Sequence, residues 1–202
     1  MKLGLAEVIG RDVPRETFEK LELFESLVVA ENAQQNLVSR ASLPDFWNRH
    51  IIDSAQLIRF APRTGSWIDL GSGAGMPGLV VAIIGDFDVT LVEPRRLRAE
   101  FLAKVVDALN LSTRVCCTKA ELVTGNYDVI SARAVAGLSR LLKISRHLST
   151  GNTVWVLPKG KSAQSELAEA RRAWQAAFHV ERSLTDRDSS IIVARNVRPL
   201  RR

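Results

Sequence analysis

The feature that most limits what this chain can fold into is a run of glycines directly after a short apolar segment. Residues 67–70 read WIDL, and residues 71–78 continue as GSGAGMPG. An apolar segment that runs into a glycine turn and then into a helix is the usual context of a nucleotide-binding loop. Glycine adopts positive φ easily and lets a ligand approach the backbone closely. The pattern therefore predicts a strand, a ligand-binding loop and a helix, in that order.

Two classes of cofactor fit this loop. Residues 73–78 match GxGxxG, which cradles the pyrophosphate of a dinucleotide. Gly71, Gly73 and Gly75, with Asp69 two residues before the first, match instead the acidic-x-GxGxG loop of S-adenosylmethionine enzymes. The methionine end of that cofactor carries an ammonium group, so an acid at the strand end is favourable there and repulsive beside a pyrophosphate. The loop therefore favours S-adenosylmethionine, and an NAD-linked oxidoreductase is the alternative.

Two later segments carry further candidate cofactor contacts. Glu93 ends the apolar segment 89–92, and an acid at that point can accept hydrogen bonds from both ribose hydroxyls of an adenosine. Both cofactor classes use such an acid. Ala120 and Glu121 follow the third predicted strand, and loops after strand ends line the ligand crevice of doubly wound folds. We expect these two residues to flank the adenine.

Short apolar strands alternate with helical segments from residue 66 onward. Strands are expected at residues 66–70, 88–92, 113–117, 127–131, 153–157, 179–183 and 191–195. Helices are expected at residues 77–84, 95–110, 138–148 and 162–178. This alternation predicts an α/β, Rossmann-like fold with a mostly parallel seven-stranded sheet and helices on both faces. The last two strands have no helix between them, so we expect an antiparallel pair at one edge.

A helical preface comes before the first strand. Phe18, Leu21, Phe24, Leu27 and Val28 recur at three- and four-residue steps, which is typical of an amphipathic helix over residues 14–38. A second helix is expected over residues 44–60. We therefore divide the chain into an N-terminal helical extension, residues 1–65, packed on a core domain, residues 66–202.

Composition excludes several classes of protein. Hydrophobic residues make up 46% of the 202 and charged residues 25%, which suits one folded domain with a proper core. The longest apolar run, residues 79–84, is far shorter than the ~20 residues of a membrane helix. Cys116 and Cys117 are adjacent and cannot join distant segments. His50, His147 and His179 show no metal-ligand spacing. We expect a reduced, cytoplasmic monomer that binds neither membrane nor metal.

The residues around the glycine loop resemble the RsmG (GidB) family of methyltransferases over roughly residues 36–161. The matching residues are Asn36-Leu37, Arg49-His50-Ile51-Ile52-Asp53-Ser54, the loop from Asp69 to Gly78, Leu91-Val92-Glu93, Arg98, Phe101-Leu102, Ala120-Glu121, Ile130-Ser131-Ala132-Arg133-Ala134 and Lys159-Gly160. The blocks before and after the loop are more specific than the loop, which alone indicates only a class I methyltransferase.

The resemblance implies a class I methyltransferase fold and transfer of a methyl group to guanine N7 in 16S ribosomal RNA of the bacterial small subunit. It also implies that Gly71 and Met76 contact S-adenosylmethionine and that Ala120 and Glu121 lie near its adenine. Arg133 is expected where cofactor and substrate meet, and an arginine there can hydrogen-bond a guanine edge or a phosphate.

The chemistry of guanine N7 agrees with this sequence. N7 presents an in-plane lone pair and carries no proton, so neither a covalent nucleophile nor a general base is expected. Methylation of pyrimidine C5 needs a cysteine nucleophile, and Cys116 and Cys117 are expected to be core thiols inside a strand. Methylation of amino groups commonly uses an Asn/Asp-Pro-Pro-aromatic loop, but residues 131–134 read SARA. A non-catalytic RNA-binding or ribosome-assembly protein is the second alternative.

The net charge of +6 is concentrated in two places. Residues 129–165 contain no acid, and the predicted RNA-binding residues lie there: Arg133, Arg140, Lys143, Arg146, Lys159 and Lys161. A second group is Arg195, Arg198, Arg201 and Arg202. His50 and Asp53 share a helix face, where they either border the ligands or tie the preface to the core; Asn36 is equally open.

Overall fold

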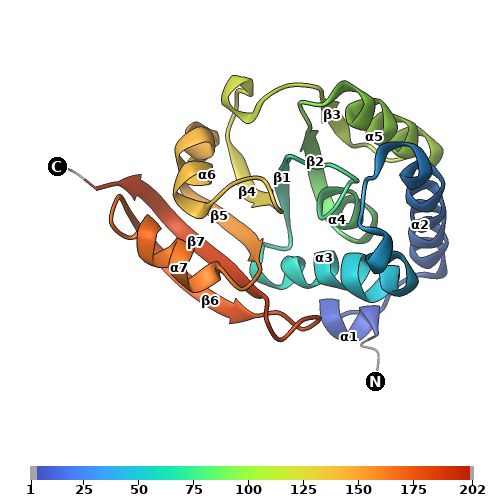
Figure 1. The fold of residues 1–202 in the computed structure, drawn as a ribbon, viewed down its shortest axis with the longest axis horizontal. Helices are drawn as coiled ribbons and strands as arrows, with labels where there is room; N and C mark the ends of the chain where they lie inside the picture. The colour runs from blue at the N-terminus through green and yellow to red at the C-terminus, as the bar shows by residue number, and fades with distance from the viewer. Residues whose placement is uncertain (1–3, 201–202) are drawn as a thin grey trace.

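The structure, a computed structural model, describes residues 4–200 of the 202-residue chain and contains one seven-stranded sheet (Figure 1). The strand order is β3-β2-β1-β4-β5-β7-β6. The strands are β1 (Thr64–Leu70), β2 (Asp86–Val92), β3 (Arg114–Cys116), β4 (Tyr127–Ala132), β5 (Ser149–Lys159), β6 (Trp174–Arg182) and β7 (Ser190–Pro199). Strands β1 to β5 are parallel, and β7 is antiparallel to both β5 and β6. The predicted mostly parallel sheet with an antiparallel edge is confirmed.

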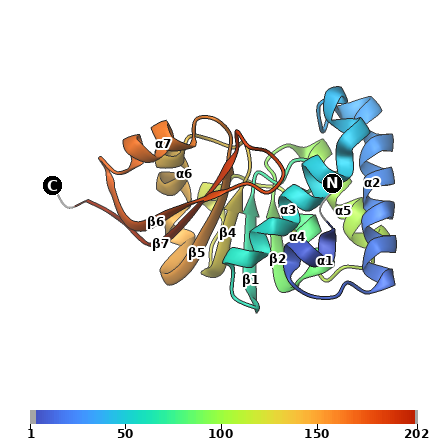
Figure 2. The same cartoon turned by 90° about the horizontal axis from the view of Figure 1, so that it is seen from below.

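Helices cover both faces of this sheet, as predicted (Figure 2). They are α1 (Leu5–Ile9), α2 (Arg15–Gln35), α3 (Asp53–Ala55), α4 (Gly78–Ile84), α5 (Arg96–Ala108), α6 (Leu138–Ser145) and α7 (Ala163–Ala170). Side chains alternate between the faces along each strand. Trp67 of β1 packs with the α1–α5 side, and its neighbour Ile68 packs with the α6–α7 side. Each face therefore has its own hydrophobic core.

The helical preface forms, although not as two regular α-helices. Leu21, Phe24 and Val28 are fully buried on one side of α2, which matches the predicted spacing. The second segment consists of a 3₁₀ turn (Arg40–Asp45), a π-helical stretch (Trp47–Ile52), α3 and another 3₁₀ turn (Gln56–Phe60). Pro44 lies inside the first turn and cannot donate a backbone hydrogen bond there. Within residues 4–200, no helix is long and apolar enough to span a membrane.

The predicted helix over residues 162–178 is wrong in its second half. Helix α7 ends at Ala170, and β6 begins at Trp174, five residues before the predicted strand at 179. Residues 174–182 pair antiparallel with β7, from Trp174 opposite Pro199 to Arg182 opposite Ser190. Their side chains alternate between exposed and half-buried positions. Helix-favouring alanine, glutamine and arginine residues obscured this edge strand, because pairing with β7 outweighs local propensity.

Candidate cofactor and substrate site

The glycine loop begins at the carboxyl end of β1 and is held by the end of β2. The N–H groups of Gly71 and Ser72 both donate to the carbonyl oxygen of Val92, at 2.7 and 3.1 Å. Gly71, Gly73 and Gly75 have φ values of 67°, 57° and 94°. In the sheet, β1 lies between β2 and β4, so the chain reverses its winding direction here. Ligands of open α/β sheets bind at such switch points.

The loop is closed by packing on one side and open on the other. A Cβ atom on Gly71 would lie 2.5 Å from Val135 Cγ2, and one on Gly78 would lie 2.3 Å from Leu91 Cδ2. A Cβ on Gly73 would meet nothing closer than 3.7 Å, with Arg98 Nη1 among the nearest atoms. The space beside the half-buried Gly73 therefore offers room for a ligand, while Gly71 and Gly78 must be glycine for close packing.

Asp69 lies inside this loop rather than on its surface. Its side chain is fully buried; Oδ1 accepts a hydrogen bond from Ser131 Oγ at 2.6 Å, and Oδ2 accepts one from the Gly78 N–H at 3.2 Å. Burial raises the pKa of Asp69 to about 6, against the lowering effect of these hydrogen bonds and of Arg133. The carboxylate thus ties β1, β4 and α4 together. Its contact with a cofactor ammonium stays a prediction.

Glu93 performs the same task at the end of β2. Its side chain is buried; Oε2 accepts a hydrogen bond from the Gly73 N–H and Oε1 accepts one from the Arg95 N–H, both at 2.9 Å. A carboxylate oxygen has two lone pairs, so each oxygen keeps one acceptor position for a ribose hydroxyl. The predicted role of Glu93 fits this geometry and stays a prediction.

The other predicted cofactor residues lie at different depths. Ala120 and Glu121 form a 3₁₀ turn (Ala120–Leu122) after β3, and Glu121 is exposed at the rim of the crevice. The Met76 side chain is only 3% exposed and packs in the core. A cofactor at the loop would therefore meet the backbone of Met76 and not its side chain.

The cysteines differ from the expectation. Strand β3 ends at Cys116, which is half-buried, and Cys117 follows it with an exposed side chain. The prediction of a core thiol is therefore wrong for Cys117. Strand β3 is three places from β4, or about 14 Å at roughly 4.8 Å per strand. Neither thiol lies beside Arg133, so the argument against cysteine catalysis stands on topology.

Two cavities open beside the segment that follows β4. One, of about 410 Å³, is lined by Arg133, Lys159 and Glu166, and the other, of about 460 Å³, by His50, Thr185 and Asp186. Asp53, Arg133 and Ser189 line both cavities. Val135 joins this half of the crevice to the glycine loop through its contact with Gly71. These cavities are the candidate substrate site. Among residues 4–200, no group of three or more metal-ligating side chains lies together.

Lys159 and Glu166 hold the segment after β4 in place through hydrogen bonds to its backbone. Lys159 Nζ lies 2.8 Å from Glu166 Oε2 and donates to the Ala136 carbonyl oxygen at 2.8 Å. The same Glu166 oxygen accepts a hydrogen bond from the Leu138 N–H at 2.8 Å. Burial raises the pKa of Glu166, but the hydrogen bonds from Lys159 and Ser162 outweigh it and lower the pKa. The Lys159 side chain is only 9% exposed, so its ammonium group faces the protein rather than solvent.

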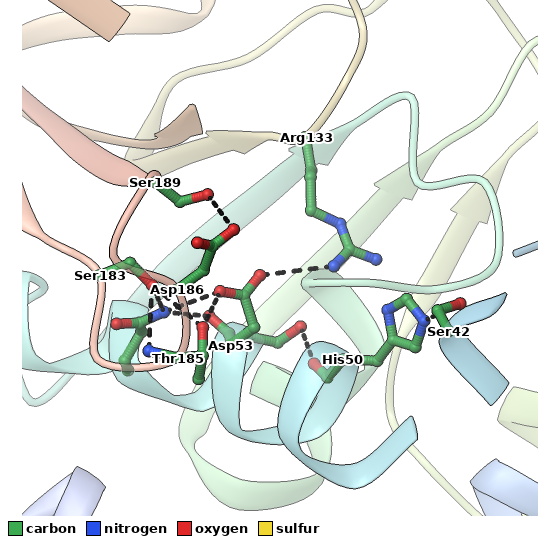
Figure 3. Close-up of polar contacts among 10 residues, drawn as sticks. Ser42, His50, Asp53, Arg133, Ser183, Thr185, Asp186 and Ser189 are labelled. Atoms are coloured by element: carbon green, nitrogen blue, oxygen red, sulfur yellow. Dashed lines mark hydrogen bonds and ion pairs between the residues drawn. The ribbon is translucent and has the colours of Figure 1, made fainter. Parts of the chain in front are cut away.

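Arg133 meets residues of the helical preface in this cavity (Figure 3). Its Nη1 lies 3.5 Å from Asp53 Oδ2. Burial lowers the pKa of Arg133, while Asp53 and Asp69 raise it. Sequence reasoning left Asp53 and His50 undecided; the structure places both at the cavity. Asn36 ends α2 in a left-handed conformation, and its N–H donates to the Asn32 carbonyl oxygen.

The predicted basic surface is divided by the structure. Arg140, Lys143 and Arg146 are exposed on and just after α6, and Lys161 forms an exposed ion pair with Asp188 at 3.0 Å. Arg195 reaches the Phe60 carbonyl oxygen at 3.5 Å, and Arg198 reaches Gln175 at 3.2 Å. Arg201 and Arg202 lie outside the described residues.

A further basic group was missed because it lies outside the acid-free segment. A hollow of about 440 Å³ joins the start of α5 to the end of α2, and its lining residues are Gln34, Gln35, Arg95, Arg96, Leu97 and Arg98. Its signal in the sequence is the short run PRRLR directly after Glu93. Because α5 follows β2, this group lies at the carboxyl edge of the sheet, beside the glycine loop.

The strand order, the glycine loop at the switch point and the carboxylates at the ends of β1 and β2 define the class I S-adenosylmethionine-dependent methyltransferase fold. A TehB-like SAM-dependent methyltransferase from Corynebacterium glutamicum is similar, with a TM-score of 0.56 at 14% identity over 71% of this chain and 87% of that one. A mutant of MtNAS in complex with S-adenosylmethionine has a TM-score of 0.60 at 18% identity over 90% and 72%. At these identities the likeness is one of fold.

The chain belongs to the GidB family, described as rRNA small subunit methyltransferase G, whose model matches residues 17–197. A relative with the name Ribosomal RNA small subunit methyltransferase G, from Novosphingobium aromaticivorans, is 53% identical over 175 residues, covering 84% of this chain and 76% of the relative. One of the same name from Zymomonas mobilis is 42% identical over 207 residues, covering 98% and 93%. The resemblance seen in the sequence is thereby confirmed.

Proposed function

We propose that this chain transfers a methyl group from S-adenosylmethionine to guanine N7 in 16S ribosomal RNA of the bacterial small ribosomal subunit. The observation that carries the proposal is the contact of Val135 with Gly71. It sets the segment bearing Arg133, with its two cavities, directly against the glycine loop. Family membership supplies the class of reaction and the ribosomal RNA substrate.

The fit of the cofactor to this loop rests on its open backbone and its buried acids. Gly73 leaves the loop open on one side, and Glu93 keeps acceptor positions beside it. We assign the cofactor to the following residues: Asp69, Gly71, Gly73, Gly75, Met76, Glu93, Ala120, Glu121 and Arg133. Asp69 acts through its negative charge and through the loop it holds. We assign residues 1–65 to the helical extension and residues 66–202 to the methyltransferase domain, with Thr64 and Gly65 already in β1.

The reaction asks for alignment rather than for acid–base groups. Bound S-adenosylmethionine supplies an electrophilic methyl group, which guanine N7 takes with its lone pair while the carbon–sulfur bond breaks and sulfur keeps the electron pair. No proton moves at N7, so no residue is needed as a general base. Arg133 and the segment after β4 orient the base for this transfer.

The partner is ribosomal RNA, and its backbone meets exposed basic side chains of this chain. Arg140, Lys143 and Arg146 are the exposed members of the predicted set, and Lys161 is exposed but paired. Lys159 supports the site from inside. We infer a monomer that acts in the bacterial cytoplasm.

The test is incubation with radiolabelled S-adenosylmethionine and small subunits that lack the modification, followed by mapping of the label. The expected product is 7-methylguanosine in 16S RNA. Label on a pyrimidine or an amino nitrogen would exclude the N7 assignment. Binding of cofactor and RNA without transfer would favour the assembly-protein alternative, and binding of a nicotinamide cofactor would favour the oxidoreductase.

A further inference from the structure

The Asp53 carboxylate is held by hydrogen bonds at one of its two oxygens, and its other oxygen is available to a ligand. Its Oδ1 accepts hydrogen bonds from Gln56 Nε2 at 2.9 Å and from Thr185 Oγ1 at 2.7 Å. Within the described residues, the contact given for its Oδ2 is the ion pair with Arg133 Nη1, at 3.5 Å. Figure 3 shows the carboxylate between the loop that carries Thr185 and the arginine. Oδ2 therefore keeps acceptor capacity toward the cavities that Asp53 lines.

His50 adds a second acceptor to this place. The Ser42 hydroxyl donates to the Ser39 carbonyl oxygen at 2.7 Å, so Ser42 Oγ must accept from His50 Nε2, which lies 2.9 Å away. The proton of the neutral ring is then on Nε2, and Nδ1 carries a lone pair. That Nδ1 atom is buried and has no hydrogen-bond partner within the described chain. A buried, unpartnered acceptor beside Arg133 indicates that a donor is supplied when the site is filled.

The other carboxylates that line the two cavities, Asp45, Glu166 and Asp186, already have partners; Asp45 Oδ2 accepts a hydrogen bond from Asn48 Nδ2 at 3.3 Å. Glu166 is satisfied by Lys159 and the Leu138 N–H. Asp186 accepts from the Asp188 N–H and from Ser189 Oγ, both at 2.9 Å, within its own turn. Asp53 differs from Glu166 and Asp186, each of whose carboxylate oxygens accepts a hydrogen bond, because the Asp53 Oδ2 contact with Arg133 is 3.5 Å long.

We propose that Asp53 is the residue that recognises guanine, by accepting hydrogen bonds from the N1–H and 2-amino group of the target base. Arg133 donates to O6 of the same base, and His50 Nδ1 takes the arginine's remaining N–H as the guanidinium turns toward the base. These contacts use the Watson–Crick edge and leave N7 free for methyl transfer. Adenine presents a lone pair at N1, which the Asp53 carboxylate repels. The inference rests on the proposed function.

The experiment compares Asp53→Asn with Asp88→Asn, a matched loss of charge at an exposed position near the start of β2 that lines neither cavity. Gln56 and Thr185 both donate to Oδ1, so the amide oxygen of the variant stays there and its NH₂ group faces the guanine donors. We expect kcat/KM for unmodified small subunits to fall by about 10- to 100-fold. The affinity for S-adenosylmethionine, measured by calorimetry, is expected to remain within about twofold, and the kcat/KM of Asp88→Asn is expected to be near that of wild type.

A second substrate separates recognition from a merely structural role. In subunits reconstituted with inosine at the mapped target, the base lacks the 2-amino group but keeps N1–H, O6 and N7. The wild-type enzyme is expected to lose about tenfold in kcat/KM on inosine. Asp53→Asn is expected to use guanosine and inosine equally. Thr185→Val removes one hydrogen bond to Asp53 Oδ1 but keeps the carboxylate. In this variant, the ratio of kcat/KM for guanosine to kcat/KM for inosine is expected to fall about threefold.

The outcomes are distinct. An undiminished preference of Asp53→Asn for guanosine over inosine, or equal losses in Asp53→Asn and Asp88→Asn, would overturn the assignment of Asp53 alone. If the wild-type enzyme placed no label on guanine N7, the proposed function would fail, and this inference with it. Should Asp53→Asn not fold, Thr185→Val with an unchanged preference decides against the proposal.

Discussion

The two halves of the crevice hold their acids in different ways. In the cofactor half, Asp69 and Glu93 accept hydrogen bonds mainly from backbone N–H groups of the glycine loop and from the start of α5. In the substrate half, Asp53 and Glu166 face the cationic side chains of Arg133 and Lys159. Backbone donors belong to chain segments that are already folded, whereas charged side chains can change partners when a ligand enters.

This difference follows from the chain segments that build each half. The cofactor half comes from two strand ends and the turns directly after them. The substrate half joins the helical preface, the segment after β4, the end of β5 and the β6–β7 loop; Asp53 and Thr185, for example, are 132 residues apart. The cofactor half therefore forms from segments that are close in sequence, and the substrate half is complete only when the whole domain has folded.

The largest effect is expected from filling the cofactor half. In Gly78→Ala, the new Cβ would lie 2.3 Å from Leu91 Cδ2 and 2.8 Å from Asp69 Cβ, so the loop must move. We expect affinity for S-adenosylmethionine to fall at least 100-fold and stability to fall by about 3 kcal/mol. Calorimetry and denaturant unfolding measure both. Gly4→Ala, where a Cβ meets nothing within 4 Å, is the comparison variant, and equal behaviour of the two would contradict this picture.

The pH dependence of stability distinguishes the two halves next. Burial raises the pKa of Asp69 from 3.8 to about 6, so the folded protein binds this proton more tightly than the unfolded chain. The stabilising contribution is complete below about pH 3.8 and is lost as the pH rises through 6. The free energy of unfolding of Asp69→Asn, measured with urea and compared with that of wild type, is expected to rise by on the order of 3 kcal/mol between pH 4 and pH 7.

His50, in the substrate half, is expected to give a pH dependence of stability of the opposite sign. Burial, and then the charges of Arg133 and Arg49, lower its pKa from 6.5 to about 4. Its contribution is complete above pH 6.5 and is lost as the pH falls through 4. His50→Gln, which keeps a donor for Ser42, is expected to lose less stability on acidification than wild type. If the stability difference from wild type changed with pH in the same direction for the Asp69 and His50 variants, burial would not control the pKa of these groups.

A smaller effect is expected from the ion pair beneath the substrate half. Lys159→Met removes the donor to Glu166 and to the Ala136 carbonyl oxygen, and stability is expected to fall by about 2 kcal/mol. Turnover on small subunits is expected to fall about tenfold, while cofactor affinity is retained. Lys161→Met, which removes an exposed ion pair two residues away, is expected to change neither. A larger activity loss in Lys161→Met would instead favour direct RNA contact.

The smallest effect is expected at the arginines beside the cofactor half. Arg95 and Arg98 line the hollow at the start of α5, and a phosphate contact to each raises the salt dependence of RNA binding. The double variant Arg95→Gln/Arg98→Gln is expected to lower the slope of log affinity against log salt by about 1.4, with unchanged melting temperature. Arg15→Gln, at the far end of α2, is expected to leave the slope unchanged. An unaltered slope in the double variant would remove this surface from the RNA interface.

The cofactor half was largely predictable because its residues are contiguous. The glycine loop and Glu93 follow apolar strands, and their spacing survives in the structure. The end of α7 was not predictable, because residues 174–178 suit a helix until β7 offers them a partner. The role of Lys159 was not predictable either: a lysine in an acid-free segment looks exposed, but Glu166 of α7 folds over it. Asp53 showed only its spacing from His50.

The sequence by itself determined the class of fold and the glycine loop, because these depend on hydrophobic periodicity and on glycines that act within a few residues. The family was indicated by its resemblance in the blocks of residues before and after that loop. Tertiary structure alone decided which charged groups face one another. Coulombic and hydrogen-bond partners are selected by distance in space, and Asp53, Arg133 and Thr185 come together only through the packing of the preface and the β6–β7 loop on the sheet. The glycine loop could be found by its neighbours in the chain, but the proposed base pocket only by its neighbours in the fold.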